Sequence, residues 1–166
     1  MNSSQCRPCS PGYYCPTPGI QTNPTLRCSK GHWCSGGSTE SAPVGKPFGT
    51  DCPNGSYCPE GTPIPIDCPK GTYNPYLGKE KIEDCVPCDP GKYCETPGKD
   101  SVTSDCHAGY YCTGNASKPN PTDGRTGNIC PEGYYCLVGS RKPLPCANGT
   151  YMNETGEHLG THCDNL

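Results

Sequence analysis

Cysteine is the residue type in this chain that can do the most chemistry. The 166 residues include 17 cysteines, and twelve of them occur in six Cys-x5-Cys sequences, in which five residues separate two cysteines. Cysteine can ligate a metal, act as a nucleophile, or be oxidised to a disulfide. This density is typical of a disulfide scaffold, and disulfides persist in oxidising compartments. The cysteines therefore predict an extracellular protein, either secreted or at the cell surface.

Eight copies of one seven-residue pattern, Cys-x-x-Gly-x-aromatic-Cys, organise the chain. We number them motifs 1 to 8; they begin at Cys9, Cys28, Cys52, Cys68, Cys88, Cys106, Cys130 and Cys146. Motifs 4 and 8 end in Asn74 and Met152 in place of the second cysteine. The spacing allows two pairings, either between neighbours (Cys9 with Cys15) or interlaced (Cys9 with Cys28, Cys15 with Cys34).

Each motif carries a glycine three residues after its first cysteine and an aromatic residue two positions later. Glycine reaches positive φ without steric cost, so each motif predicts a tight turn that reverses the chain. The turn glycines are Gly12, Gly31, Gly55, Gly71, Gly91, Gly109, Gly133 and Gly149. The aromatic rings are expected to cover the adjacent disulfides. They are Tyr14, Trp33, Tyr57, Tyr73, Tyr93, Tyr111, Tyr135 and Tyr151.

The rest of the chain is poor in the residues that build a conventional core. Only nineteen residues are Ile, Leu, Val, Phe, Met or Trp, and the spacers between motifs are rich in Pro, Gly, Ser and Thr. The best candidate for a helix, residues 79–84, allows at most one turn. The expected fold class is therefore a small disulfide-rich one: an elongated tandem repeat of short β-hairpins and irregular loops with almost no helix.

The cysteines also repeat over a longer distance. Those of residues 6–85 recur 78 or 79 residues later, which indicates two tandem modules of eight cysteines each, residues 7–85 and 86–163. Residues 1–6 are interpreted as the end of a preceding repeat or an inter-subunit contact. Residues 164–166 are interpreted as the start of a further repeat or the end of the chain.

One run of residues resembles a known family. Cys68-Pro-Lys-Gly-Thr-Tyr-Asn-Pro, followed by Cys85-Val-Pro-Cys88 and Pro-Gly-Lys-Tyr-Cys94, is similar to the ephrin-receptor-like cysteine-rich repeat, itself related to tumour-necrosis-factor-receptor and epidermal-growth-factor-like modules. The resemblance implies that Cys68 pairs with Cys85, and Cys146 with Cys163. It also implies an extracellular stalk, adhesion or matrix element rather than an enzyme.

Cys6 is the cysteine left over after two modules of eight. By the repeat it corresponds to Cys85, which would close a loop begun in a preceding module. Either the sequence is a window from a longer array, or copies associate end to end and Cys6 meets a neighbour's cysteine. A leftover thiol without a biological role is the alternative. A head-to-tail contact that does not close on itself generates a filament.

Other functional sites are weakly supported by the residues. His158, His162 and Cys163 resemble metal-ligand spacing, but Gly156 and Gly160 disfavour the helix that such spacing needs. We predict no metal, no cofactor and no enzymatic activity, because no catalytic or phosphate-binding motif is present. Dispersed charge predicts no nucleic-acid partner, and the lack of a long apolar run predicts no membrane insertion in this segment.

The expected modifications and contacts follow from surface chemistry. Five Asn-x-Ser/Thr sequons predict N-linked glycan at Asn2, Asn54, Asn115, Asn148 and Asn153. The first tyrosine of each pair, Tyr13, Tyr110 and Tyr134, is a candidate contact for a partner. The favoured function is a structural building block of a glycosylated fibre, stalk or matrix, whose partner is another copy or a neighbouring repeat. The alternative is a receptor or adhesion ectodomain that binds a protein or glycan.

Overall fold

The computed structural model describes residues 7–19, 24–45, 47–158 and 163–165. These residues form seven two-stranded antiparallel sheets and one 3-10 turn, η2 (Ile82–Asp84). The sheets pair β1 (His32–Cys34) with β2 (Gly49–Asp51), β3 (Ser56–Tyr57) with β4 (Ile66–Asp67), β5 (Thr72–Tyr73) with β6 (Val86–Pro87), β7 (Lys92–Tyr93) with β8 (Ser104–Asp105), β9 (Tyr110–Cys112) with β10 (Gly127–Ile129), β11 (Tyr134–Tyr135) with β12 (Leu144–Pro145), and β13 (Thr150–Tyr151) with β14 (Asp164–Asn165). The predicted fold class, small disulfide-rich hairpins with almost no helix, is confirmed.

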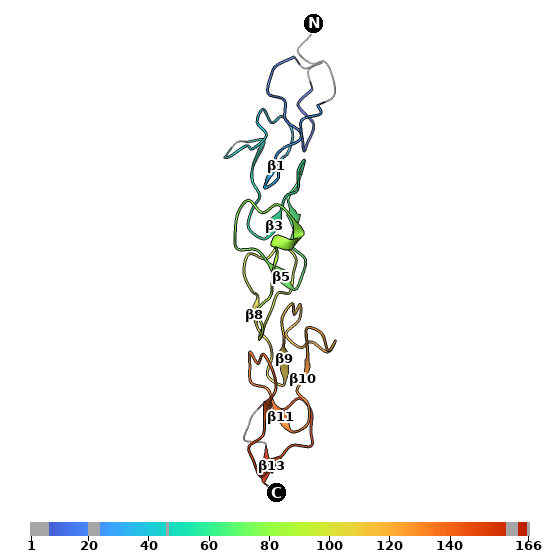
Figure 1. The fold of residues 1–166 in the computed structure, drawn as a ribbon, viewed down its shortest axis with the longest axis vertical. Helices are drawn as coiled ribbons and strands as arrows, with labels where there is room; N and C mark the ends of the chain where they lie inside the picture. The colour runs from blue at the N-terminus through green and yellow to red at the C-terminus, as the bar shows by residue number, and fades with distance from the viewer. Residues whose placement is uncertain (1–6, 20–23, 46, 159–162, 166) are drawn as a thin grey trace. The chain divides into compact units, whose positions relative to one another are not determined.

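The chain divides into two compact units. Unit 1 comprises Met1–Cys68 and Asn74–Cys85, and unit 2 comprises Pro69–Tyr73 and Val86–Leu166. Residues 69–73 thus belong to unit 2, although the predicted first module includes them. Within each unit the hairpins follow one another in chain order (Figure 1). No helix of the described ranges is long and apolar enough to cross a membrane.

Every hairpin begins at the turn inside a motif. In each motif the fifth residue donates its backbone N–H to the carbonyl of the second, as Tyr13 does to Ser10 at 3.1 Å. The motif glycine has φ between 78° and 86° in all eight copies. This is the backbone of a type II turn. The third of its four residues, here the motif glycine, needs positive φ, which glycine adopts freely. The turn leads directly into the first strand of each pair.

Disulfide sulfur takes the place of an aliphatic core. Thirteen of the fifteen buried hydrophobic residues among those described are cysteines, and the other two are Ala116 and Met152. In unit 2, Cys106, Cys112 and Ala116 form a buried cluster against which the ring of Tyr93 packs. Tyr93 belongs to motif 5, so it contacts the disulfide of the following motif. The buried interior is therefore assembled where consecutive motifs meet.

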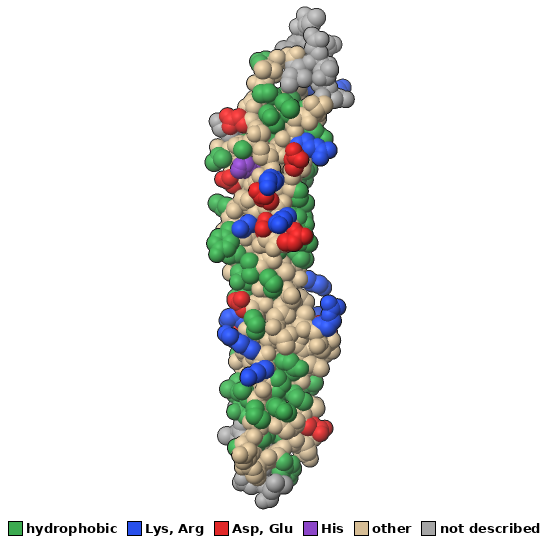
Figure 2. Space-filling view, viewed as in Figure 1, with side chains coloured by type: hydrophobic (Ala, Val, Ile, Leu, Met, Phe, Trp, Pro, Cys, Tyr) green, Lys and Arg blue, Asp and Glu red, His purple; other side chains and the backbone are tan. Residues whose placement is uncertain are grey.

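The surface mixes charges of both signs. Around β3 and η2, acidic and basic side chains lie interspersed on the same part of the surface (Figure 2). Several large apolar side chains are also exposed in unit 1, among them Phe48 at 50% and Leu77 at 62%. Exposed apolar side chains in this number reflect a fold that has little interior in which to place them.

Candidate functional site

The structure joins each motif's two cysteines to each other. The six neighbour pairs are Cys9–Cys15, Cys28–Cys34, Cys52–Cys58, Cys88–Cys94, Cys106–Cys112 and Cys130–Cys136. Motifs 4 and 8, which lack a second cysteine, pair Cys68 with Cys85 and Cys146 with Cys163. Each disulfide lies within one unit. Cys6, for which an inter-subunit or inter-module bond was predicted, lies outside the described residues.

The turn explains why neighbouring cysteines pair. Chain reversal at the motif glycine brings the two flanking Cα atoms to within 5.7–6.4 Å in the six neighbour pairs. Disulfides usually span Cα separations of about 4.4–6.8 Å, so the backbone holds both sulfurs at bonding distance. Each of these six motifs is a covalently closed ring with its glycine at the tip.

The motif glycines also join each motif to the next. In unit 1, Gly12 donates its N–H to the carbonyl of Cys34 at 2.8 Å and accepts from Cys28 N–H at 3.0 Å. In unit 2, Gly91 forms the same two bonds with Cys112 and Cys106, at 2.8 and 2.9 Å. The glycines of motifs 1 to 7 all repeat this pattern, each within one unit. We call this set of backbone bonds the motif ladder. Sequence reasoning assigned these glycines to turns and missed the ladder.

A second pair of backbone bonds completes six of these seven contacts, the exception being that of motif 4 with motif 5. A residue of positive φ follows each motif closely; after motif 3 it is Gly61, whose N–H bonds to the carbonyl of Cys28 at 2.8 Å. The next residue, Thr62, accepts from Cys34 N–H at 3.0 Å. Asn115 takes the place of such a glycine after motif 6, and it is the one non-glycine residue with positive φ in the described part of the chain.

Side chains are excluded where the backbones approach most closely. A Cβ built on Gly31 would lie 2.7 Å from the carbonyl oxygen of Gly78, and one on Gly71 would lie 2.5 Å from that of Asn115. In both cases the glycine contacts a segment that follows a later motif: Gly31 of motif 2 faces the segment after motif 4, and Gly71 of motif 4 faces the segment after motif 6. A Cβ on Gly149, in motif 8, meets nothing within 4 Å. Gly31 and Gly71 are therefore needed for proximity as well as for turn geometry, whereas an added Cβ on Gly133 meets nothing within 4 Å although Gly133 makes the same ladder bonds.

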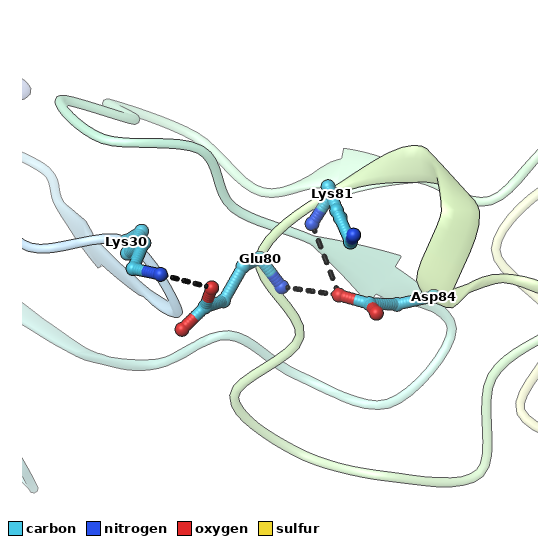
Figure 3. Close-up of polar contacts among 4 residues, drawn as sticks. All are labelled: Lys30, Glu80, Lys81 and Asp84. Carbon is cyan, nitrogen blue, oxygen red and sulfur yellow. Dashed lines mark hydrogen bonds and ion pairs between the residues drawn. The ribbon is translucent and has the colours of Figure 1, made fainter.

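An ion pair accompanies one of these approaches in unit 1 (Figure 3). Lys30 Nζ lies 2.7 Å from Glu80 Oε2, and this bond raises the pKa of Lys30. Asp84 Oδ2 accepts from the backbone N–H of Glu80 at 2.9 Å and of Lys81 at 3.2 Å. The N–H of Glu80 is the main cause that lowers the pKa of Asp84. The carboxylate of Asp84, the last residue of η2, thus fixes the two residues that precede this turn.

The remaining predicted site residues lie at the surface. The sequon asparagines Asn54, Asn115, Asn148 and Asn153 are exposed, and Asn2 lies outside the described residues. Of the predicted aromatic positions, Tyr151 is 45% exposed and the other seven are half-buried. His158 is exposed, and no group of three metal-ligating side chains occurs among the residues that the structure describes.

Equivalent loops of the two units each contain a pocket that sequence reasoning missed. In unit 1 the pocket has a volume of about 180 Å³ and is lined by Ser38, Thr39, Glu40, Pro43, Pro47 and Phe48. In unit 2 it has a volume of about 110 Å³ and is lined by Ser117, Lys118, Pro121, Thr122, Asp123 and Thr126. A shift of 78 residues relates four of these six positions, Pro43 to Pro121 among them. We call them the unit 1 pocket and the unit 2 pocket.

Both pockets depend on a glycine and a proline that the motif pattern does not include. A Cβ on Gly49 would lie 2.7 Å from Cγ of Pro43, and one on Gly127 would lie 2.5 Å from Cγ of Pro121. Both prolines are buried. The only sequence signal was their recurrence 78 residues apart, in stretches that otherwise read as spacer.

No protein-family model matches this chain, and no match was found among curated proteins. The motif ladder and the two pockets are therefore the features of this chain that bear on its function. The ladder offers a repeated set of backbone donors and acceptors that can join one motif to another. The pockets offer small recesses of contrasting chemistry.

Proposed function

We propose that the chain is a structural building block of an extracellular, glycosylated fibre, stalk or matrix, and that it acts through end-to-end association. The observation that carries the proposal is the motif ladder. Motifs 1 to 7 bind the next motif with the same backbone groups of glycine and of the flanking cysteine positions. A contact made by backbone atoms does not depend on the side chains of the spacers, so it can be repeated along an array.

The last motif supplies the groups for a further contact of the same kind. Gly149 has φ of 85°, as the other motif glycines do, and open space beside it. Another motif, from a neighbouring repeat or another copy, would bind Gly149 through the bonds that Cys106 and Cys112 make with Gly91. Heterologous contacts of this type propagate without closing and so produce filaments.

The extracellular location is supported by the cross-links. Eight disulfides in a chain of this length need an oxidising environment in order to persist. The exposed sequon asparagines are accessible for N-linked glycan, which would cover the polar spacers. The proposed relation to ephrin-receptor-like repeats agrees with this environment.

Sedimentation velocity over a hundredfold concentration range tests the proposal on secreted, oxidised protein. We expect species that grow in mass with concentration. Gly149→Asn adds a side chain at the free glycine while tolerating positive φ, as Asn115 does at 56°. It should abolish growth, whereas Gly45→Asn, at a glycine of φ 61° with nothing within 4 Å of an added Cβ, should not. A wild-type chain that stays monomeric throughout would contradict the proposal.

A receptor or adhesion ectodomain is the second candidate. The observation that favours it is the unit 1 pocket, an apolar recess next to a carboxylate. Tyr134, the first tyrosine of its pair, is also 40% exposed, whereas Tyr13 and Tyr110 are half-buried. A monomeric chain that binds a protein or glycan ligand would favour this function over the fibre.

A further inference from the structure

The disulfide of motif 1 is the least buried of the six disulfides that join neighbouring cysteines. Cys15 is half-buried and Cys9 is 8% exposed, whereas the cysteines of the other five are at most 1% exposed. Motifs 2, 3, 5, 6 and 7 each receive ladder bonds from the glycine of the preceding motif. The described residues contain no motif before motif 1. Its two cysteines are therefore partly uncovered.

The aromatic residue of motif 8 shows the converse. Tyr151 is 45% exposed, whereas the aromatic residues of the other seven motifs are half-buried. Its neighbour Met152 is 8% exposed, so the high exposure is specific to the tyrosine. Unit 1 thus carries a disulfide that lacks a cover, and unit 2 carries a ring that covers little.

A contact inside unit 2 shows how such a ring and such a disulfide fit together. The ring of Tyr93, in motif 5, packs against the cluster formed by Cys106, Cys112 and Ala116. These two cysteines form the disulfide of motif 6 and are fully buried. The aromatic residue of one motif therefore covers the disulfide of the next, and both apolar surfaces are removed from water.

The junction of motif 4 with motif 5 is the internal counterpart of a contact between motif 8 and motif 1. The cysteine repeat of 78 or 79 residues relates motif 8 to motif 4, and motif 5 to motif 1. In this junction Gly71 donates its N–H to the carbonyl of Cys94 at 2.8 Å and accepts from Cys88 N–H at 2.9 Å. The chain thus contains one example of the bonds that would join two copies.

The backbone groups needed for a second such junction are free. They are the N–H and the carbonyl of Gly149 in motif 8, and the carbonyl of Cys15 and the N–H of Cys9 in motif 1. None of these four groups has a hydrogen-bond partner within the described residues. Two donors and two acceptors therefore stand beside the exposed ring and the uncovered disulfide.

We propose that Tyr151 of one copy covers the Cys9–Cys15 disulfide of the next copy, while Gly149 makes the two ladder bonds with the same two cysteines. This inference rests on the proposed end-to-end association and assigns its two faces. The partner is a second copy, because this chain carries both halves of a contact that it already makes between its own motifs. The two faces differ, so the contact is heterologous and has one direction.

The test is an NMR titration between two versions of the full, oxidised chain. The observed chain is 15N-labelled Gly149→Asn, in which motif 8 is blocked and motif 1 is unchanged. Unlabelled wild-type chain is the titrant. We expect the amides of Cys9, Gly12 and Cys15 to shift, and those of residues 88–94, in the equivalent motif whose partner is already in place, to stay unchanged. Unlabelled Gly149→Asn as the titrant should cause no shift.

Substitutions of Tyr151 in the titrant separate the ring from the backbone bonds. Tyr151→Ser should weaken binding about tenfold or more because it removes the apolar face, whereas Tyr151→Phe should change it less than about twofold. Tyr134→Ser is the matched control, since Tyr134 is 40% exposed but is not the aromatic residue of its motif. It should bind as the wild-type chain does. Native-like spectra of 15N-labelled samples establish that each variant is folded, and undiminished binding by Tyr151→Ser would refute the assignment.

The two faces can fail separately from the association itself. Wild-type chain that grows in mass with concentration but leaves the motif 1 amides unshifted would overturn this assignment and leave the proposed function standing. Wild-type chain that stays monomeric and causes no shift would overturn both.

Discussion

The loop from β1 to β2 and the loop from β9 to β10 have the same backbone and different surfaces. Ser35 N–H bonds to the carbonyl of Phe48 at 3.0 Å, and Thr113 N–H bonds to that of Thr126 at 2.9 Å. The loops share a second backbone bond. In unit 1 Ser29 donates its N–H to the carbonyl of Ser41 at 2.7 Å, and in unit 2 His107 donates its N–H to the carbonyl of Pro119 at 2.8 Å. The equivalent prolines are buried in both. A common scaffold therefore supports both loops.

The two loops differ in what closes them. In unit 1 the ring of Phe48 packs on Gly37. In unit 2 the carboxylate of Asp123 accepts bonds from Thr126 N–H at 2.7 Å, Arg125 N–H at 2.8 Å and Thr126 Oγ1 at 2.8 Å. An apolar contact in one loop is thus replaced by a hydrogen-bonded turn in the other. Glycine, proline and cysteine determine the scaffold, and the other positions are free to carry different chemistry.

The largest effect is expected from breaking what the two loops share. Gly49→Ala and Gly127→Ala would drive a methyl group into the facing proline and into a carbonyl of the paired strand. Overpacking costs about 1–3 kcal/mol and a disfavoured backbone costs a similar amount, so we expect each variant to lose about 3 kcal/mol or more. Hydrogen exchange of the β2 and β10 amides measures the loss in each unit.

Gly45→Ala and Gly124→Ala are the matched controls for this prediction. Both glycines have positive φ, at 61° and 69°, and neither has a neighbour within 4 Å of an added Cβ. These variants carry the backbone strain alone and should lose about 1 kcal/mol. Equal losses in all four variants would mean that the approach of proline to glycine does not stabilise the loops.

Local chemistry explains which parts of this fold the sequence predicts. The motif turns were predictable because glycine at a fixed offset from cysteine selects a type II turn within four residues. Hairpins beside those turns were predicted and are confirmed. The cysteine pairing was left open because the spacing alone fits both neighbour and interlaced bonds. Pairing depends on how closely the turn brings the two Cα atoms together.

Contacts between segments distant in sequence were not predictable in the same way. The ladder partner of Gly12 is Cys34, and nothing in the intervening spacer specifies that distance. The approach of Gly31 to Gly78 joins residues far apart along the chain. Gly49 and Gly127 lie outside the motif pattern, so their role appears only when Pro43 and Pro121 are seen beside them. The pockets were missed for the same reason.

Motifs 4 and 8 differ at the position where the other motifs have their second cysteine. Exchanging this residue should give a loss of stability of intermediate size. Asn74 replaces the second cysteine of motif 4 and is fully buried, with Nδ2 donating to the carbonyl of Ser56 at 2.9 Å and Oδ1 accepting from Tyr76 N–H at 3.0 Å. Its counterpart in unit 2 is Met152. Asn74→Met leaves both backbone groups without partners, and we expect a loss of about 2 kcal/mol in urea unfolding.

Asn120→Met is the control for this exchange. Asn120 is exposed, so the same substitution should change the free energy of unfolding by less than about 0.5 kcal/mol. A small loss at Asn74 as well would show that methionine fills the position in unit 1 as it does in unit 2.

Acidification should affect the two loops differently, and this effect should be smaller than that of Asn74→Met. Hydrogen bonds to the carboxylate, chiefly from Thr126 N–H, lower the pKa of Asp123 from 3.8 to about 2. A folded-state pKa below the unfolded value contributes stability that is present above about pH 4 and is lost as the pH falls toward 2. Amide exchange at Arg125 and Thr126 should therefore accelerate between pH 4 and pH 2, after correction for intrinsic rates.

The loop of unit 1 has Gly45 at the position of Asp123, so its amides should show no such transition. Asp123→Asn should remove the transition in unit 2, because asparagine does not titrate. A transition that persists in this variant would assign it to another carboxyl group.

The smallest effect is expected at Lys30 and Glu80, which make an ion pair in unit 1 where unit 2 has Ala108 and His158. The two side chains are 66% and 42% exposed, so water and salt screen their attraction. Lys30→Ala should barely lower the thermal midpoint at low salt and should have no effect at 1 M salt. The pair accompanies the approach of Gly31 to Gly78 but does not create it, because unit 2 brings Gly109 to Gly156 although uncharged Ala108 stands at the position of Lys30. A loss as large as that of Gly49→Ala would mean that side-chain charge, rather than the motif ladder, holds these segments together in unit 1.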